Sequence, residues 1–220
     1  MLEAVKSLLL ILSALFPIVN PLGGSPVFLL LTREYPPDIR RALARRIAMN
    51  SFFLLIGSYL IGAHVLAFFG VSLPVVQVGG GLVVISSAWS LLKRGDDEER
   101  SAVHRNTEAH DMFHHAFYPL TMPLTVGPGS ISVAVTLGAN VAHFHSANLF
   151  AILAAIIAAL LIALSIYLCY AFADRLAQAI GASAMSIIMR LSSFLLVCIG
   201  VQILWNGVSA LLASIPLQVR

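Results

Sequence analysis

The amino-acid sequence predicts an all-α integral membrane protein of six transmembrane segments, built as two inverted three-helix repeats with broken first and fourth helices. Three observations lead to this fold class. Hydrophobic residues make up 59% of the 220 residues and charged residues only 10%, whereas soluble domains carry about 25% charged residues. Long stretches hold no charged residue at all, and one pattern of prolines occurs in both halves. Lipid is therefore the expected solvent for most of the chain.

Charge-free stretches give the number of segments. No Asp, Glu, Lys or Arg occurs over residues 47–92, 112–173 or 191–219. A bilayer core of about 30 Å takes roughly 20 apolar residues per helix, so the first two stretches each hold two segments and the third holds one. Together with the apolar N-terminal stretch, six segments are expected, at about residues 8–31, 47–69, 74–92, 116–138, 148–173 and 187–213.

Basic residues predict the orientation in the membrane. Eleven Lys and Arg lie in or beside the connections that follow the first, third and fifth segments, against Lys6 and Arg220 on the opposite side. Because cytoplasmic loops carry an excess of Lys and Arg, these connections should be cytoplasmic and both termini outside, in the cell's inner (plasma) membrane. The basic residues are thus topology signals, and the net charge of +3 does not indicate binding of nucleic acid.

Internal repetition is the most informative feature of the sequence. In each half, three prolines are spaced by four and then by five residues: Pro17, Pro21 and Pro26, and later Pro119, Pro123 and Pro128. A repeat of three segments, an odd number, must be inserted upside down relative to its twin, as in many secondary transporters. The predicted division is residues 1–110 for the first repeat, with a cytoplasmic polar loop at 93–111, and residues 111–220 for the second.

The prolines and neighbouring glycines should break the first and fourth segments. An internal proline costs a helix about 3 kcal/mol, and an unpaired backbone group at membrane depth is tolerated only inside protein or beside water. A simple kink is one outcome. The other is a pair of half-helices that meet near the midplane, where positive N-termini suit a carboxylate and freed carbonyls suit an ammonium group or a cation.

The residues at both breaks resemble the two signature stretches of the MarC family of bacterial and archaeal membrane proteins. The matching stretches are Asn20–Pro26 and Pro123–Ile131, and Gly79–Gly81 and Gly200–Gln202 also fit. Members of that family include proteins described as neutral amino-acid transporters. The resemblance implies that eight residues contact the substrate: Asn20, Gly23, Gly24, Ser25, Thr125, Gly127, Gly129 and Ser130. Each of them could instead only permit close approach of helices.

Carboxylates are absent from the interior of the segments, since all ten Asp and Glu fall in tails, loops or their borders. A permanently cationic substrate or a carboxylate proton relay would usually need one within the membrane. The expected partners are therefore the lipid bilayer and a small neutral solute such as an amino acid, with a coupling cation and a homo-oligomer left open. Three polar groups within segments could line the pathway or bond helix to helix: Asn50, Gln77 and Gln202.

Histidines invite a metal hypothesis, which the spacing does not favour. Six of the seven lie in two connections: His104, His110, His114, His115, His143 and His145. No cysteine or carboxylate completes a fixed ligand spacing, so no metal and no other cofactor is expected. His64 lies alone within the second segment and is expected to be a satisfied interior histidine, with a proton relay as the alternative.

Two functions from different classes remain. The first is a secondary transporter of small neutral solutes, above all neutral amino acids, that works by alternating access at a midplane site between the two broken helices. The second is a membrane-embedded enzyme: an intramembrane hydrolase with Ser130 or Ser25 as nucleophile and His64 as base, or a thiol redox protein using Cys169 and Cys198. Transport explains the repeat directly and catalysis does not, so transport is preferred and no catalytic residue is assigned.

Overall fold

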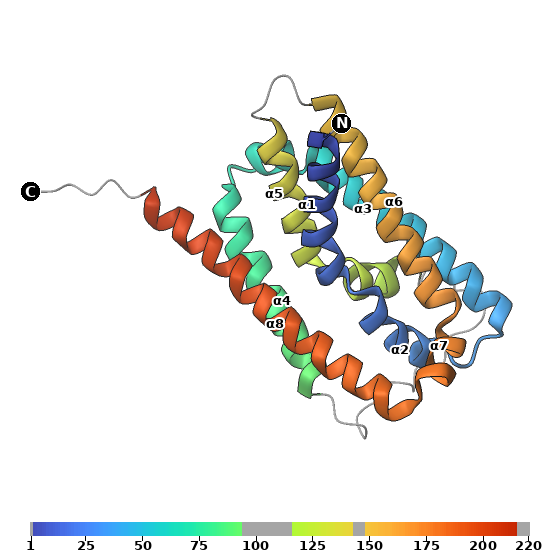
Figure 1. Ribbon diagram of the computed structural model, residues 1–220. Helices are drawn as coiled ribbons and strands as arrows, with labels where there is room; N and C mark the ends of the chain where they lie inside the picture. The colour runs from blue at the N-terminus through green and yellow to red at the C-terminus, as the bar shows by residue number, and fades with distance from the viewer. Residues whose placement is uncertain (1, 94–115, 143–147, 215–220) are drawn as a thin grey trace, which may run out of the picture.

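The computed structural model describes residues 2–93, 116–142 and 148–214, and in these residues the fold is entirely helical (Figure 1). The helices are α1 (Leu2–Val19), α2 (Pro21–Leu31), α3 (Pro37–Phe68), α4 (Leu73–Lys93), the π-helical segment η2 (Ala116–Thr125), α5 (Pro128–Ala142), α6 (Asn148–Ala171), α7 (Ala173–Ile180) and α8 (Ala182–Ala213). In these residues five stretches are long and apolar enough to cross a membrane: α1 and α2 taken together, α3, α4, α6 and α8. Six spans result if the bent pair η2 and α5 forms one more. The all-α membrane fold is confirmed.

The first break lies at Asn20, between α1 and α2. This residue adopts the left-handed conformation, with φ 45° and ψ 62°, and its side-chain oxygen accepts a hydrogen bond from the Gly23 N–H at 3.2 Å. Asn20 precedes a proline, which disfavours the right-handed helical conformation there, and Asn is one of the few residues that tolerate the left-handed one. The break is shallow, because α1 and α2 still continue as one span over Val5–Leu31.

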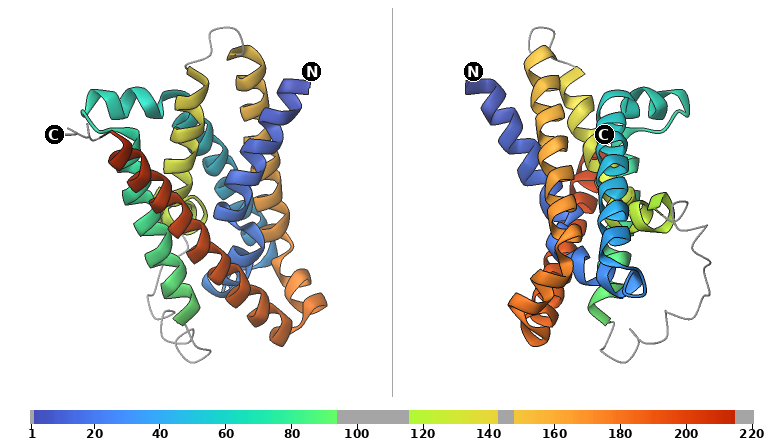
Figure 2. Two further views of the ribbon diagram at one scale, coloured as in Figure 1. Left: turned by 60° about the vertical axis from the view of Figure 1, so that its left-hand side comes forward. Right: turned by 90° about the vertical axis from the view of Figure 1, so that its right-hand side faces the viewer.

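The second break is much sharper. A bend of 70° separates η2 from α5, so that η2 lies across the bundle beside α3 while α5 runs along it (Figure 2). Tyr118 and Met122, each followed by a proline, have extended backbone angles near φ −120° and ψ 124°, as expected for residues before proline. The hydroxyls of Thr121 and Thr125 donate to carbonyls five residues earlier, at 2.6 and 2.7 Å. Side chains thus supply donors that this irregular backbone lacks.

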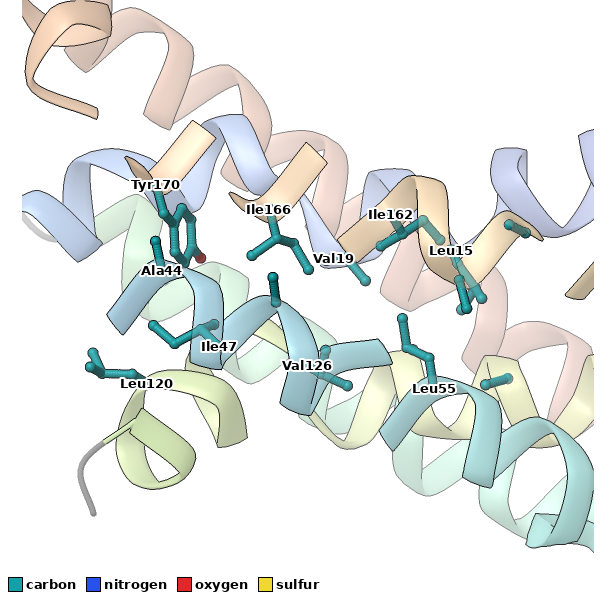
Figure 3. Close-up of a cluster of buried hydrophobic side chains, with 14 of the residues drawn as sticks. Leu15, Val19, Ala44, Ile47, Leu55, Leu120, Val126, Ile162, Ile166 and Tyr170 are labelled. Atoms are coloured by element: carbon teal, nitrogen blue, oxygen red, sulfur yellow. The ribbon is translucent and has the colours of Figure 1, made fainter. Parts of the chain in front are cut away.

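The helices fall into two packing units. Buried apolar side chains form one cluster whose members come from α1, α2, α3, η2, α5, α6, the first residue of α7 and Val126, which links η2 to α5. We call these helices the body. Figure 3 shows part of this cluster, with Ile47 on α3 and Ile166 on α6 among its members. None of the described residues of α4 or α8 belongs to it. These two helices pack extensively against each other, and we call the pair the panel (Figure 1).

Glycines bring the two helices of the panel together. A Cβ added at Gly81 would lie 2.6 Å from the backbone nitrogen of Leu204, and one added at Gly200 would lie 3.0 Å from that of Ile85. The panel meets the body mainly along α5, where Gly80 approaches Ser132 and Gly129 contacts Val84. Small residues at membrane helix interfaces allow this close approach, and van der Waals packing then holds the helices.

Most predicted segments are confirmed, with three differences. The helix α3 begins at Pro37, ten residues before the predicted second segment, and α7 is a short additional helix that joins α6 to α8. Arg40 of α3 forms an ion pair with Asp174 of α7 at 2.8 Å, which fixes the two helices where the sequence predicted a connection. The break in the first span is a left-handed Asn rather than a bend at the glycines, none of which has a positive φ there.

Pairwise packing follows a pattern that two related repeats would produce. The helix α1 packs on α6 as α5 packs on α3, α2 packs on α6 as η2 packs on α3, and α4 packs on α8. Exchanging the two halves leaves this set of neighbours unchanged. The inverted relation of the repeats, and the division at residues 110 and 111, stay predictions.

The orientation in the membrane is open to a direct experiment. The start of α1 and the end of α8 lie in the upper half of each view in Figure 2, so both termini should be on one side. Green fluorescent protein fused after Arg220 should stay dark, because basic residues place that end outside the cytoplasm. The same protein inserted within residues 93–111 should fluoresce. Fluorescence at the C-terminus would contradict the orientation and remove the topological argument for inversion.

Candidate functional site

Tyr170 on α6 joins the two broken segments. Its hydroxyl lies 3.0 Å from the Thr125 hydroxyl at the end of η2, and its ring stacks on Phe28 of α2 with the ring centroids 4.6 Å apart. A Cβ on Gly24 of α2 would lie 2.6 Å from the same hydroxyl. The side chain is 2% exposed and points from α6 toward α3 and η2 in Figure 3. Gly24 and Thr125, both predicted site residues, therefore meet at one buried hydroxyl.

The other predicted polar residues form hydrogen bonds with backbone groups at the breaks. Asn20 caps α2 through the Gly23 N–H, as described above. The Ser25 hydroxyl donates to the Leu22 carbonyl at 2.9 Å, which has no helical amide partner because Pro26 lacks an N–H. Ser130 donates to the Gly127 carbonyl at 2.9 Å, and this carbonyl also accepts from the Ile131 N–H at 3.1 Å. Each hydroxyl proton is therefore occupied, and these groups face a solute only through their lone pairs.

The remaining two glycines have different surroundings. Gly129 is in contact with Val84 and lies against Gly80, so it permits close approach of α4 to α5. A Cβ on Gly127 would meet the Pro123 carbonyl oxygen at 3.1 Å, within its own turn of the chain. The eight predicted residues thus do not converge on one ligand-sized space. The structure gathers Gly24 and Thr125 at Tyr170 and distributes the others along the two breaks.

A cavity of about 280 Å³ lies beside the first break, between the panel and the body. Its walls come from α1, α4, α5 and α8, and Pro17 and Ile18 bring it within one turn of Asn20. Apolar side chains make up most of the lining, and the polar members are Ser13, Gln77, Thr136, Gln202 and Asn206. No Asp, Glu, Lys or Arg is among the described residues that line it.

The polar groups of the cavity form two pairs. Gln77 of α4 donates from Nε2 to the Thr136 hydroxyl of α5 at 3.4 Å, and Thr136 donates in turn to the Ser132 carbonyl. On α8, Gln202 donates from Nε2 to Asn206 Oδ1 at 2.9 Å. The first pair crosses from panel to body, and the second stays within one helix. Both leave amide groups free for a ligand.

Sequence reasoning identified part of this cavity. Gln77 and Gln202 were expected to line a pathway or to bond helices: both line the cavity, and Gln77 also bonds α5. Asn50 bonds Thr121 at 3.4 Å and is not among the lining residues. Asn206, Thr136 and Tyr170 were missed. The signal for Tyr170 was a hydroxyl within a strongly apolar segment, where it is one of three with Ser165 and Tyr167. The signal for Asn206 was its spacing of four residues from Gln202.

The structure also describes the histidine and the two cysteines of the predicted segments. His64 was expected to be an interior histidine, which is wrong: it lies exposed near the end of α3. Cys169 and Cys198 are both free, so no disulfide joins them. The six remaining histidines lie outside the described residues.

These features define an all-α integral membrane protein with two interrupted helices and an uncharged cavity beside one of them. Comparison with known proteins agrees: the model of the MarC family of integral membrane proteins matches residues 5–212, and this chain belongs to that family. A UPF0056 membrane protein of Methanocaldococcus jannaschii is 31% identical over 202 residues, which cover 91% of this chain and 95% of that protein. No solved structure matches the chain.

Two further relatives have the same extent. The UPF0056 membrane protein YvbG of Bacillus subtilis is 28% identical over 202 residues, with 90% of this chain and 92% of that protein covered. The UPF0056 inner membrane protein MarC of Escherichia coli is 29% identical over 213 residues, with 94% and 96% covered. The similarity therefore spans both breaks and all the helices.

Proposed function

We propose that this protein is a secondary transporter of small neutral solutes, with neutral amino acids as the favoured class, in the inner (plasma) membrane with both termini outside the cytoplasm. The observation that carries the proposal is the uncharged cavity at the boundary of two packing units, one turn from a break in a membrane helix. Interrupted helices beside a cavity are the usual setting of solute sites in such transporters.

The size and chemistry of the cavity support a small, uncharged or zwitterionic solute. About 280 Å³ is just below the ~300–1,000 Å³ of typical ligand pockets. A solute with a net charge would lose hydration worth at least ~2.5–3.5 kcal/mol without a counter-ion in the lining. The Pro17 carbonyl also lacks its helical partner, because Pro21 has no N–H, and can accept from an ammonium group.

The division into body and panel supplies a physical basis for alternating access. Body helices share one apolar cluster that excludes the panel, so the panel can move as a unit while the body keeps its packing. The cavity has Gln77 and Gln202 on one side and Thr136 on the other, so a rotation of the panel about its contact with α5 would open or close it. Tyr170, buried where α2, η2 and α6 meet, would then keep the opposite half of the solute pathway closed.

The enzyme alternative receives less support. A Ser–His hydrolase needs a hydroxyl that donates to a base, whereas Ser25 and Ser130 both donate to carbonyls of their own turn. The named relatives are described only as membrane proteins. Transport thus accounts for the broken helices and the cavity together.

Competition for uptake tests the proposal. Purified protein in liposomes should take up labelled alanine, and unlabelled alanine and serine should compete, whereas lysine should compete at least about tenfold less well because no carboxylate offsets its second positive charge. Liposomes without protein provide the background. Equal competition by lysine would contradict the neutral-substrate assignment, and the absence of uptake for every neutral amino acid would contradict amino-acid transport.

A further inference from the structure

The cavity at the panel–body boundary contains more hydrogen-bonding capacity than its internal pairs use. We propose that the amides of Gln77, Gln202 and Asn206, together with the Thr136 hydroxyl, form the contact site for the polar groups of the solute, and that this site takes a small zwitterion. The inference rests on the proposed function and deepens it. It places recognition on α4, α5 and α8, at residues other than those that form the two breaks.

The hydrogen-bond donors and acceptors that the amides leave unused match the charged groups of a zwitterion. Gln77 and Gln202 each use one N–H in the cavity pairs and keep a second, and Asn206 accepts through Oδ1 and keeps both of its N–H groups. Four N–H groups thus remain for a carboxylate, one from each glutamine and two from Asn206. The Oε1 atoms of Gln77 and Gln202 remain as acceptors for an ammonium group. Dipoles can divide the two charges of a zwitterion between them, but they cannot neutralise an additional one.

The position of these groups explains how binding of a solute would affect the contact between the panel and the body. All three amides belong to the panel, and Thr136 belongs to the body. Two side-chain hydrogen bonds cross the boundary between α4 and α5: the Ser132 hydroxyl donates to the Val76 carbonyl at 3.1 Å, and Gln77 donates to Thr136 at 3.4 Å. The bond from Gln77 is the longer one, near the limit at which such a bond contributes. A solute that offers a charged partner would form stronger hydrogen bonds than this neutral pair. Binding would therefore change the contact between the two units.

The competing interpretation is structural. Gln202 and Asn206 are four residues apart on one helix, a spacing at which side chains pair without any ligand. On that interpretation, replacing them with leucine would leave solute affinity unchanged. Asn50 offers a matched control, since it too donates from an amide to a threonine hydroxyl at 3.4 Å across helices but is not among the cavity-lining residues.

Direct binding of alanine to the purified full-length protein tests the site without requiring transport. Gln77→Leu and Gln202→Leu should each weaken alanine affinity by about tenfold or more, the effect of losing a hydrogen bond to a charged group. Asn50→Leu should stay within about twofold of the unchanged protein. Melting temperature and size-exclusion profile confirm that each variant is folded.

A gain of selectivity provides a second test that a misfolded variant could not pass. Gln202→Glu keeps the size of the side chain and adds a negative charge, so lysine should bind this variant at least about tenfold more tightly than it binds the unchanged protein. Asn50→Glu, outside the cavity lining, should not show this gain.

The outcomes separate the site from the function. Alanine binding that is lost in the cavity variants, in a protein that shows no uptake, would support the site and contradict transport. Uptake of alanine that is equal in all variants would support transport and overturn the site. Failure of the unchanged protein to bind alanine, serine or glycine would overturn the proposal that the site takes a small zwitterion.

Discussion

Gly81→Val should destabilise the panel severely, whereas Gly79→Val, two residues away on the same helix, should be tolerated. A Cβ at position 81 would lie 2.6 Å from the Leu204 nitrogen and 2.8 Å from the Gly200 carbonyl oxygen, both backbone atoms of α8. Backbone atoms cannot rotate away as a side chain does, so α4 and α8 would have to separate. Overpacking costs about 1–3 kcal/mol even where side chains can adjust, and the cost here should reach or exceed the upper value.

The measurement is the melting temperature of the purified protein in detergent. A loss of about 3 kcal/mol corresponds to a decrease of roughly 6–12 °C for a protein of this size. Gly79→Val isolates the contact, because nothing lies within 4 Å of a Cβ at that position and the change in helix propensity is the same. Equal melting temperatures for both variants would show that α4 and α8 do not pack through Gly81.

Much of this fold could be predicted from the sequence, because lipid imposes long apolar segments and the charges mark their ends. Prolines located both breaks to within a few residues. Their geometry could not be predicted in the same way: the shallow break at Asn20 and the 70° bend before α5 come from the same proline spacing. One difference is local, since the hydroxyls of Thr121 and Thr125 donate to carbonyls of the irregular backbone in the second half.

The candidate site was less predictable than the fold. Prolines and glycines show where a backbone is irregular. The polar residues beside them, such as Asn20 and Ser25, form hydrogen bonds with that backbone and do not line the cavity. The cavity depends instead on which helices become neighbours. Gln77 and Thr136 are 59 residues apart in the chain, and Thr125 and Tyr170 are 45 apart. No local pattern encodes such a pairing, because it results from the packing of helices that are each merely apolar.

Gly24→Ala should reduce alanine uptake by about tenfold or more, and Tyr170→Phe in the same chain should restore most of it. A Cβ at position 24 would lie 2.6 Å from the Tyr170 hydroxyl oxygen, while the nearest ring carbons are 3.5 Å away, an ordinary contact. The ring cannot move aside easily, since it is buried and stacked on Phe28. Overpacking of about 1–3 kcal/mol is therefore expected from one methyl group.

The double variant identifies the atom responsible. Tyr170→Phe alone removes the hydroxyl and its hydrogen bond to Thr125, at a cost of about 1 kcal/mol, while Thr125 keeps its bond to the Leu120 carbonyl. If the clash is with the hydroxyl, the two changes are strongly non-additive, and the double variant melts higher than Gly24→Ala alone. Gly57→Ala, where nothing lies within 4 Å of the added carbon, is the matched control and should be neutral or slightly stabilising. Additive losses in the double variant would show that the junction of α2, η2 and α6 is not closed by Tyr170, and the assignment of that residue to the shut half of the pathway would be wrong.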